Sequence, residues 1–157
     1  MKLDARVEQA LIEINFVERY ENISKKYNRE RTPKGQELDY FDGDFLMEIV
    51  ELLGYKAQYD KRERFFHIDL EEIGYFRFGF HFALEYGRLE LIWVVYEEDK
   101  VVLGSPWTRY PRLMIARDYI IKQPIISDYV DFRDIMKIAF EMYEDFKQVF
   151  LKISKDK

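Results

Sequence analysis

The stretch of sequence that decides the fold is residues 76–95, FRFGFHFALEYGRLELIWVV. Apolar residues alternate with polar or small residues in its first part, up to Leu84, and again from Leu89 onward. This period of two is typical of strands that bury one face. The dipeptide Tyr86-Gly87 lies between the two parts and suits a two-residue turn. The stretch therefore predicts a β-hairpin with one continuous apolar face.

The turn at residues 86–87 also predicts which residues of the hairpin pair. A slip of one residue would move every side chain to the other face, so the apolar pattern fixes the register. We expect these cross-strand pairs: Glu85 with Arg88, Leu84 with Leu89, Phe82 with Leu91, and Phe80 with Trp93. In this register the apolar residues of both strands share one face, and the first pair joins opposite charges.

Strands are also predicted on both sides of the hairpin. Residues 64–70 form the preceding strand, joined to the hairpin by a five-residue connection at 71–75, because a four-residue connection would swap the faces. The resulting pairs are Leu70 with Phe76, Asp69 with Arg77, and Ile68 with Phe78. Residues 101–103 predict a short following strand, and residues 55–59 suit a further strand before the others.

Helical spacing of apolar residues marks both ends of the chain. It predicts a helix over residues 4–26 and a long final helix capped by Asp131. Between them, 28–42 suits a loop, 45–53 a helix capped by Asp42 or Asp44 and ended by Gly54, and 112–119 a short helix. The order of elements predicts an α+β fold: an antiparallel β-meander of four to five strands with N- and C-terminal helices packed on one face. The length suits a single domain, 1–157.

The composition excludes several classes of site and partner. The 157 residues contain no cysteine, which excludes disulfides, thiolate metal sites and cysteine nucleophiles. The N-terminal residues lack the apolar core of a signal peptide, and no apolar run reaches the roughly 20 residues of a membrane span. We therefore expect a cytoplasmic protein without membrane contact. A formal net charge of −5 argues against nucleic acid as a partner.

Two histidines are the residues best suited to metal binding or acid–base chemistry. In the predicted register His67 faces Gly79, so His81 is its diagonal neighbour, and Glu90 is diagonal to His81 on the next strand. Two histidines and a carboxylate can bind zinc or iron, but no HxH or HxxxH spacing supports such a site. We expect no metal, no cofactor and no catalytic residue. A small-ligand-binding protein or an enzyme that uses this face is one alternative.

Acidic turns form the candidate partner-binding surface. Alternate turns of an antiparallel meander lie at the same end of the sheet, so the carboxylates of two turns should gather there. The predicted surface comprises Glu71, Glu72, Glu97, Glu98 and Asp99, with Tyr75 and Tyr96 beside them. Trp107 and Tyr110, which flank a proline-containing loop, are a further candidate contact elsewhere on the molecule. Carboxylates attract a basic protein and speed its encounter, while aromatic side chains supply contact area.

The general character of the chain resembles that of bacterial immunity proteins, which neutralise polymorphic or contact-dependent toxins. The resemblance rests on an acidic, cysteine-free, aromatic-rich α+β chain without a catalytic motif, and on no residue signature. It implies a non-catalytic protein that occludes a basic toxin domain, as a monomer or weak homodimer. A secretion chaperone or adaptor, which would use an apolar groove, is the second alternative.

Overall fold

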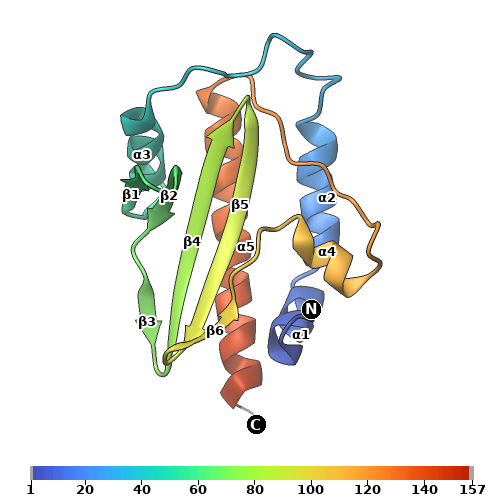
Figure 1. Cartoon of the computed structure of the whole chain (residues 1–157), viewed down its shortest axis with the longest axis vertical. Coiled ribbons are helices and arrows are strands. Elements are labelled where there is room, and N and C mark those ends of the chain that lie inside the picture. The colour runs from blue at the N-terminus through green and yellow to red at the C-terminus, as the bar shows by residue number, and fades with distance from the viewer. Residues whose placement is uncertain (1, 156–157) are drawn as a thin grey trace.

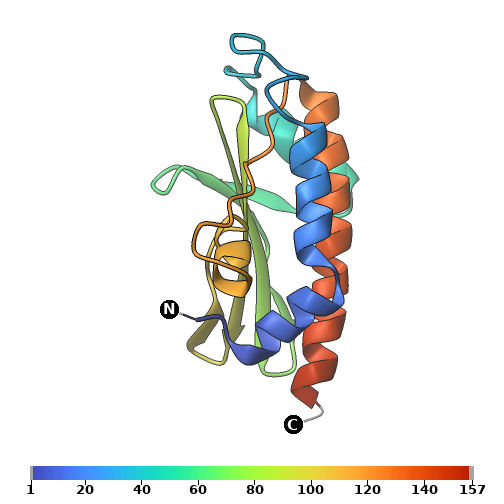
Figure 2. The same cartoon turned by 90° about the vertical axis from the view of Figure 1, so that its right-hand side faces the viewer.

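In the computed structural model, which describes residues 2–155, helices from both ends of the chain cover one face of an antiparallel sheet (Figures 1 and 2). The helices are α1 (Ala5–Glu13), α2 (Phe16–Lys26), α3 (Gly43–Leu52), α4 (Arg109–Met114) and α5 (Tyr129–Lys155). The strands are β1 (Ala57–Asp60), β2 (Phe65–Ile68), β3 (Glu71–Ile73), β4 (Phe76–Glu85), β5 (Arg88–Glu97) and β6 (Lys100–Leu103). The predicted α+β class and one-sided helix packing are confirmed.

The sheet has six strands within the described residues, in the order β1-β2-β4-β5-β6, with β3 also paired to β4. The hairpin of β4 and β5 is its centre, and the predicted register is confirmed. Tyr86 and Gly87 adopt φ angles of 52° and 74°, which is the geometry of the tight hairpin turn that matches strand twist. The observed pairs include Glu85 with Arg88, Leu84 with Leu89, Phe82 with Leu91, and Phe80 with Trp93.

The predicted register of the preceding strand is wrong. Phe66 pairs with Phe82 and His67 with His81, a shift of two residues from the prediction that leaves the faces unchanged. The cause is a two-residue turn at Gly74-Tyr75, where Gly74 has a φ of 61° that a residue without a Cβ adopts freely. That turn makes β3 a separate strand on the same edge of β4, which raises the strand count from the predicted four or five to six.

Leu70 was expected on the apolar face, but the structure places it on the opposite face. Its side chain lies over Gly79, where a Cβ would come within 2.8 Å of the Leu70 Cδ2 atom. Continuing the register of β2 along β4 would place Leu70 opposite Phe78, but Glu71 lies there, so the residues between β2 and β3 shift the alternation by one position. Leu70 remains 46% exposed.

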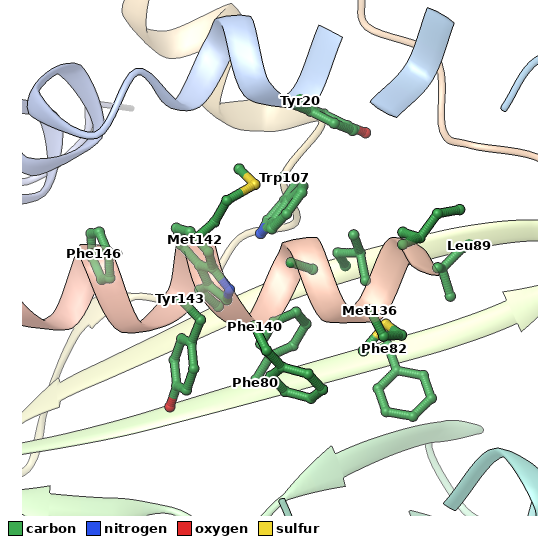
Figure 3. Packing of buried hydrophobic residues seen from close by; sticks show 14 of the residues in the cluster. Tyr20, Phe80, Phe82, Leu89, Trp107, Met136, Phe140, Met142, Tyr143 and Phe146 are labelled. Atoms are coloured by element: carbon green, nitrogen blue, oxygen red, sulfur yellow. The ribbon is translucent and has the colours of Figure 1, made fainter. Parts of the chain in front are cut away.

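The core lies between the Phe-rich face of the sheet and α5. Phe78, Phe80 and Phe82 are fully buried, and Phe76 is 8% exposed. Figure 3 shows aromatic and aliphatic side chains of α5 meeting those of the sheet. The ring of Phe80 packs against Phe140 at a centroid distance of 5.0 Å. The prediction that one continuous apolar face binds the terminal helices is therefore confirmed.

The predicted N-terminal helix is two helices. Asn15 adopts a left-handed conformation with φ 56° and ψ 44°, which ends α1 and starts α2 at an angle to it (Figure 2). Asparagine tolerates this conformation better than most residues with a side chain. The break lets the chain bury Val7 and Leu11 on α1 and Phe16 on α2. The apolar period of the sequence continues through Asn15, because both helices keep their apolar residues on the side that faces the core. The period therefore predicted one continuous helix.

The predicted ends of α3, α4 and α5 are correct only in part. Asp42 caps α3, since its Oδ1 accepts from the Asp44 backbone N–H at 3.0 Å, and Gly54 follows with a φ of 102°. Asp131 does not cap α5. Its backbone N–H donates to Asp128 Oδ1 at 2.9 Å, so Asp128 is the cap and Asp131 lies in the first turn. The short helix α4 spans 109–114 and not the predicted 112–119.

Residues 104–126 cover the edge of β5 that β6 leaves open. The Trp107 N–H donates to the Leu91 carbonyl at 2.8 Å, and the Leu89 N–H donates to the Pro124 carbonyl at 3.0 Å. Pairing of this kind removes an exposed strand edge, which would otherwise offer a template for aggregation. No helix among residues 2–155 is both long and apolar enough to cross a membrane.

Candidate functional site

The two acidic segments lie toward the same end of the sheet, but Glu71 and Glu72 belong to strand β3 and not to the turn that was predicted for them. The Glu98 N–H donates to the Tyr75 carbonyl at 2.9 Å, which joins the β5–β6 turn directly to the β3–β4 turn. Glu97 also lies opposite Phe76 in the ladder between β4 and β5. Figure 1 shows both turns together at the end of the long hairpin away from Tyr86. The structure therefore brings Tyr75, Glu98 and Asp99 together as the sequence suggested.

Two of the five acidic residues at this edge are tied to cations of the same chain. Arg6 binds Glu97 at 2.9 Å, and its guanidinium holds the pKa of the Glu97 carboxyl below its usual value. Glu71 forms an ion pair with Lys147, whose side chain is only 4% exposed. Lys147 also binds Glu144 at 3.0 Å and lies 4.5 Å from the ring centroid of Tyr143. Glu71 therefore compensates a buried charge of the fold.

The remaining acids of the turn edge share it with basic side chains. Glu72, Glu98 and Asp99 are exposed. Arg77 donates to the Glu98 carbonyl at 3.1 Å and lies 4.9 Å from the ring centroid of Tyr96. Because cations lie among the carboxylates, the electrostatic field at this edge is weaker than a count of its acids suggests.

Trp107 and Tyr110, expected at a partner-binding surface, lie in the core. Their side chains are 1% and 0% exposed, respectively. The Trp107 ring packs edge-on against Trp93 at 5.2 Å, and the Tyr110 hydroxyl donates to the Ser105 carbonyl at 2.9 Å. Residues 104–126 fold back along β5 and carry both rings inward, so neither ring offers a contact for a partner.

A stronger acidic surface surrounds α3. Residues 35–55 form the longest stretch of the chain without Lys or Arg, and they contain six acidic residues. The rest of the chain has 24 acidic and 25 basic residues, so this stretch accounts for the whole net negative charge. Glu37 pairs with Arg29 at 3.0 Å. The other acids are all exposed, namely Asp39, Asp42, Asp44, Glu48 and Glu51.

Large apolar side chains are exposed among these carboxylates. Tyr40 is 96% exposed and Leu52 is 88% exposed, while Phe45 and the nearby Tyr59 of β1 are 41% and 43% exposed. Singly exposed apolar residues are common, but several together with charges around them mark interaction sites. We call the exposed acids of residues 39–51 together with these four side chains the acidic α3 face.

The acidic α3 face contains a hollow of about 300 Å³ between the start of α3 and β1. Its walls are mainly apolar, and two of its lining residues carry a carboxylate. The lining residues are Phe41, Asp42, Gly43, Asp44, Met47, Tyr59 and Phe66. The Tyr129 hydroxyl accepts from the Asp42 backbone N–H at 2.9 Å, which attaches the start of α3 to α5. The geometry suits one inserted side chain with an apolar stem.

The two histidines lie directly opposite each other and not on a diagonal. His67 and His81 are cross-strand partners with ring centroids 5.9 Å apart, and Phe65 stacks on His81 at 4.6 Å. A shallow hollow of about 380 Å³ includes both rings, with Asp60 and Asp69 at its border. Among residues 2–155 no group of three or more His, Asp or Glu side chains could hold a metal ion.

Burial and the neighbouring His67 lower the pKa of His81 to about 4. The His81 ring is therefore neutral at physiological pH, and its free ring nitrogen could accept a hydrogen bond from a ligand in the hollow. A perturbed pKa in a concave site is a sign of function, although buried structural residues show it as well. The Phe65 ring covers one face of His81, which favours a structural role.

The depressed pKa of His81 predicts a loss of stability in mild acid. The unfolded chain takes up a proton near pH 6.5 while the folded chain resists it until about pH 4, so stability falls as pH falls through this window. Because His81 is partly exposed, we expect a loss of only about 1 kcal/mol between pH 7 and pH 5. Urea unfolding of the wild type and His81→Gln at both pH values measures it. Equal losses in both proteins would contradict the prediction.

Sequence reasoning missed the acidic α3 face although a signal for it was present. The gap in basic residues between Lys34 and Lys56 is visible in the sequence and indicates an acidic segment. The exposure of Tyr40 and Leu52 could not be read from periodicity, because both could have packed on a neighbour. In comparisons with known proteins, no family model, curated protein or solved structure matches this chain.

Proposed function

We propose that this protein is a non-catalytic binding module for a basic protein, and that the acidic α3 face is its main contact surface. The observation that carries the proposal is the concentration of charge. One exposed segment holds all of the net negative charge, and it also presents Tyr40, Phe45 and Leu52 to solvent. Together these features supply electrostatic steering and apolar contact area.

Each feature of the face has a physical role in the proposed complex. Uncompensated carboxylates raise the rate of encounter with a cationic surface and reject acidic competitors. Tyr40 and Phe45 are rigid side chains, which lose little conformational entropy when they bind. The hollow beside Asp42 and Asp44 accepts a Lys or Arg from the partner, with the aliphatic stem against Tyr59 and the cation at the carboxylates. A central anchored side chain is typical of binding hot spots.

Within this class, the proposed role is that of an immunity protein that neutralises a basic toxin domain by occlusion. The general resemblance of the sequence to such proteins supports this role, and so does an acidic surface suited to a nucleic-acid-cleaving or otherwise basic toxin. Occlusion needs shape and charge complementarity and no chemistry from the inhibitor. The exposed acids of the turn edge, Glu72, Glu98 and Asp99, are proposed as a weaker, secondary contact for the same partner.

A small-ligand site is the second candidate function. The observation in its favour is the hollow that contains His67 and the neutral ring of His81. A ligand that fills it would stack against aromatic rings and accept or donate one hydrogen bond. Turnover of a small substrate by the isolated protein, lost in His81→Gln, would replace the protein-binding proposal with this one.

Matched charge reversals test which surface binds the partner. The partner is isolated by co-purification with the full-length tagged protein, and association rates are then measured by stopped flow in low salt. The α3 variant carries Asp39→Lys, Glu48→Lys and Glu51→Lys, and avoids Asp42 and Asp44 because carboxylates there stabilise the helix N-terminus. We expect it to associate roughly 10–100-fold more slowly than the wild type, because loss of steering acts on the association rate.

The control variant makes the same charge change at the turn edge, with Glu72→Lys, Glu98→Lys and Asp99→Lys. We expect its association rate to fall by less than about threefold, because basic side chains already offset this edge. The difference between the two variants should shrink in 0.5 M salt, where exposed charges are screened. A control variant that slows association as much as the α3 variant, or more, would move the contact surface to the turn edge.

A further inference from the structure

The segment that covers the edge of β5 is basic, in contrast to the rest of the chain. Residues 104–126 contain Arg109, Arg112, Arg117 and Lys122, with Asp118 as the one acidic residue. Their formal charge is +3, although the net charge of the whole chain is −5. Figure 1 shows α4 and α3 on opposite sides of the long hairpin, so this charge lies away from the acidic α3 face.

The three arginines of this segment line a single hollow. Its volume is about 460 Å³, and the described residues that line it are Arg109, Arg112, Leu113 and Arg117. Arg109 and Arg112 are three residues apart on α4, which places them on the same side of the helix. Arg117 approaches from the loop that follows. None of the described lining residues is acidic.

One contact fixes the position of a guanidinium group in this hollow. Arg112 Nε donates to the Arg117 carbonyl at 2.9 Å, which joins the helix to the loop after it. The bond uses a single N–H of Arg112 and leaves the two terminal nitrogens of the fork for other acceptors. A guanidinium held in place before binding loses less entropy when it meets a ligand.

We propose that this hollow binds the phosphate dianion of a small phosphorylated molecule. A dianion beside Arg112 and Arg117 gains charge-assisted hydrogen bonds from both guanidinium groups. The planar fork of arginine matches the oxygens of phosphate in pairs. Leu113 supplies an apolar wall, and the hollow exceeds the space of a phosphate group, which leaves room for an attached organic group.

A long nucleic-acid strand fits the site less well than an isolated phosphate. Binding a strand requires a row of phosphate contacts along a basic track. The basic side chains here converge on one hollow, and Glu18 and Glu21 of the neighbouring α2 lie on the groove between α2 and α4. This site is independent of the proposed protein-binding function, because it uses other residues on another side of the molecule.

Titration of the full-length protein by NMR tests the proposal. Spectra of backbone amides and arginine Nε–H groups are recorded at pH 7.5 and constant ionic strength, with inorganic phosphate, phenyl phosphate and phenol as probes. Both phosphates should give saturable shifts confined to residues 109–117, and phenol should give none. Tighter binding of phenyl phosphate than of inorganic phosphate identifies an esterified phosphate as the ligand. Equal affinities identify free phosphate.

Three single substitutions make the result specific. Arg117→Gln and Arg112→Gln should each weaken phosphate binding about tenfold, since each removes a charge-assisted contact. Arg117→Gln keeps the backbone carbonyl that Arg112 binds, so it leaves α4 intact. Arg62→Gln removes the same charge from the exposed β1–β2 turn and should leave affinity unchanged. Absence of saturation with both phosphates, or equal weakening by Arg62→Gln, would overturn the proposal.

Discussion

Replacing Phe80 with alanine is expected to lower the free energy of unfolding by about 3–5 kcal/mol, the usual cost of removing a fully buried Phe side chain. The Phe80 side chain is 0% exposed. Its ring contacts Trp93 at 6.3 Å, Phe140 at 5.0 Å and Tyr143 at 5.4 Å between ring centroids. Rigid rings around it cannot collapse to fill the space, so the cost should lie in the upper half of the range.

Urea unfolding measures this change, and Phe45→Ala is the matched control. Phe45 lies on α3 and is 41% exposed, so the same truncation should cost less than about 1 kcal/mol there. Alanine is also a better helix former than phenylalanine, which offsets part of that small cost. A cost below about 1 kcal/mol for Phe80→Ala would mean that the Phe-rich face is not the buried face.

Neutralising both acids around Lys147 is expected to cost about 3 kcal/mol, because it leaves a buried cation without a counter-charge. The Lys147 side chain is 4% exposed, whereas Glu71 and Glu144 are 50% and 44% exposed. In Glu71→Gln/Glu144→Gln the ammonium keeps the Tyr143 ring as a neighbour but loses both carboxylates. Thermal or urea unfolding at neutral pH and moderate salt measures the loss.

A third substitution separates the charge effect from packing. Adding Lys147→Met to the double variant removes the buried charge and keeps a flexible side chain of similar length. We expect the triple variant to regain most of the lost stability, because a buried ion pair is often replaced by apolar groups at little cost. If the triple variant stays as unstable as the double variant, the contacts of the two acids matter through packing and not through charge.

The hairpin of β4 and β5 could be predicted from sequence because two independent signals agreed. Alternation from Phe76 to Leu84 defined the buried face, and Tyr86-Gly87 defined the turn. Only one register satisfies both conditions, and it is the observed one. The long stripe of α5 was predicted for the same reason, since its apolar period is unbroken over many turns.

Elements that depend on a single unusual backbone angle could not be predicted. The bend at Asn15 and the turn at Gly74 each need a positive φ, and the apolar pattern on either side is compatible with a continuous element. The short helix α4 was placed a few residues too late, because Pro111 lies within its first turn, where proline is tolerated, and not before it. Local conformations of this kind change a register without changing which residues are apolar.

The candidate sites, like the fold, could be predicted only in part. The sequence predicted that two acidic segments lie at one end of the sheet. It could not reveal that Arg6 and Lys147, which are distant in the chain, pair with Glu97 and Glu71 of these segments. It also could not tell that Trp107 points inward. Surface charge was more predictable than surface exposure, because the absence of Lys and Arg from residues 35–55 needs no structure to be seen.

Carboxyl footprinting of the complex tests the central claim most directly. A water-soluble carbodiimide labels exposed Asp and Glu side chains, and mass spectrometry compares the free protein with its complex with the co-purified partner. We predict that labelling of Asp44, Glu48 and Glu51 falls several-fold in the complex, while labelling of Glu141 on α5 stays unchanged. Unchanged labelling of all three acids of α3 in a saturated complex would contradict the account.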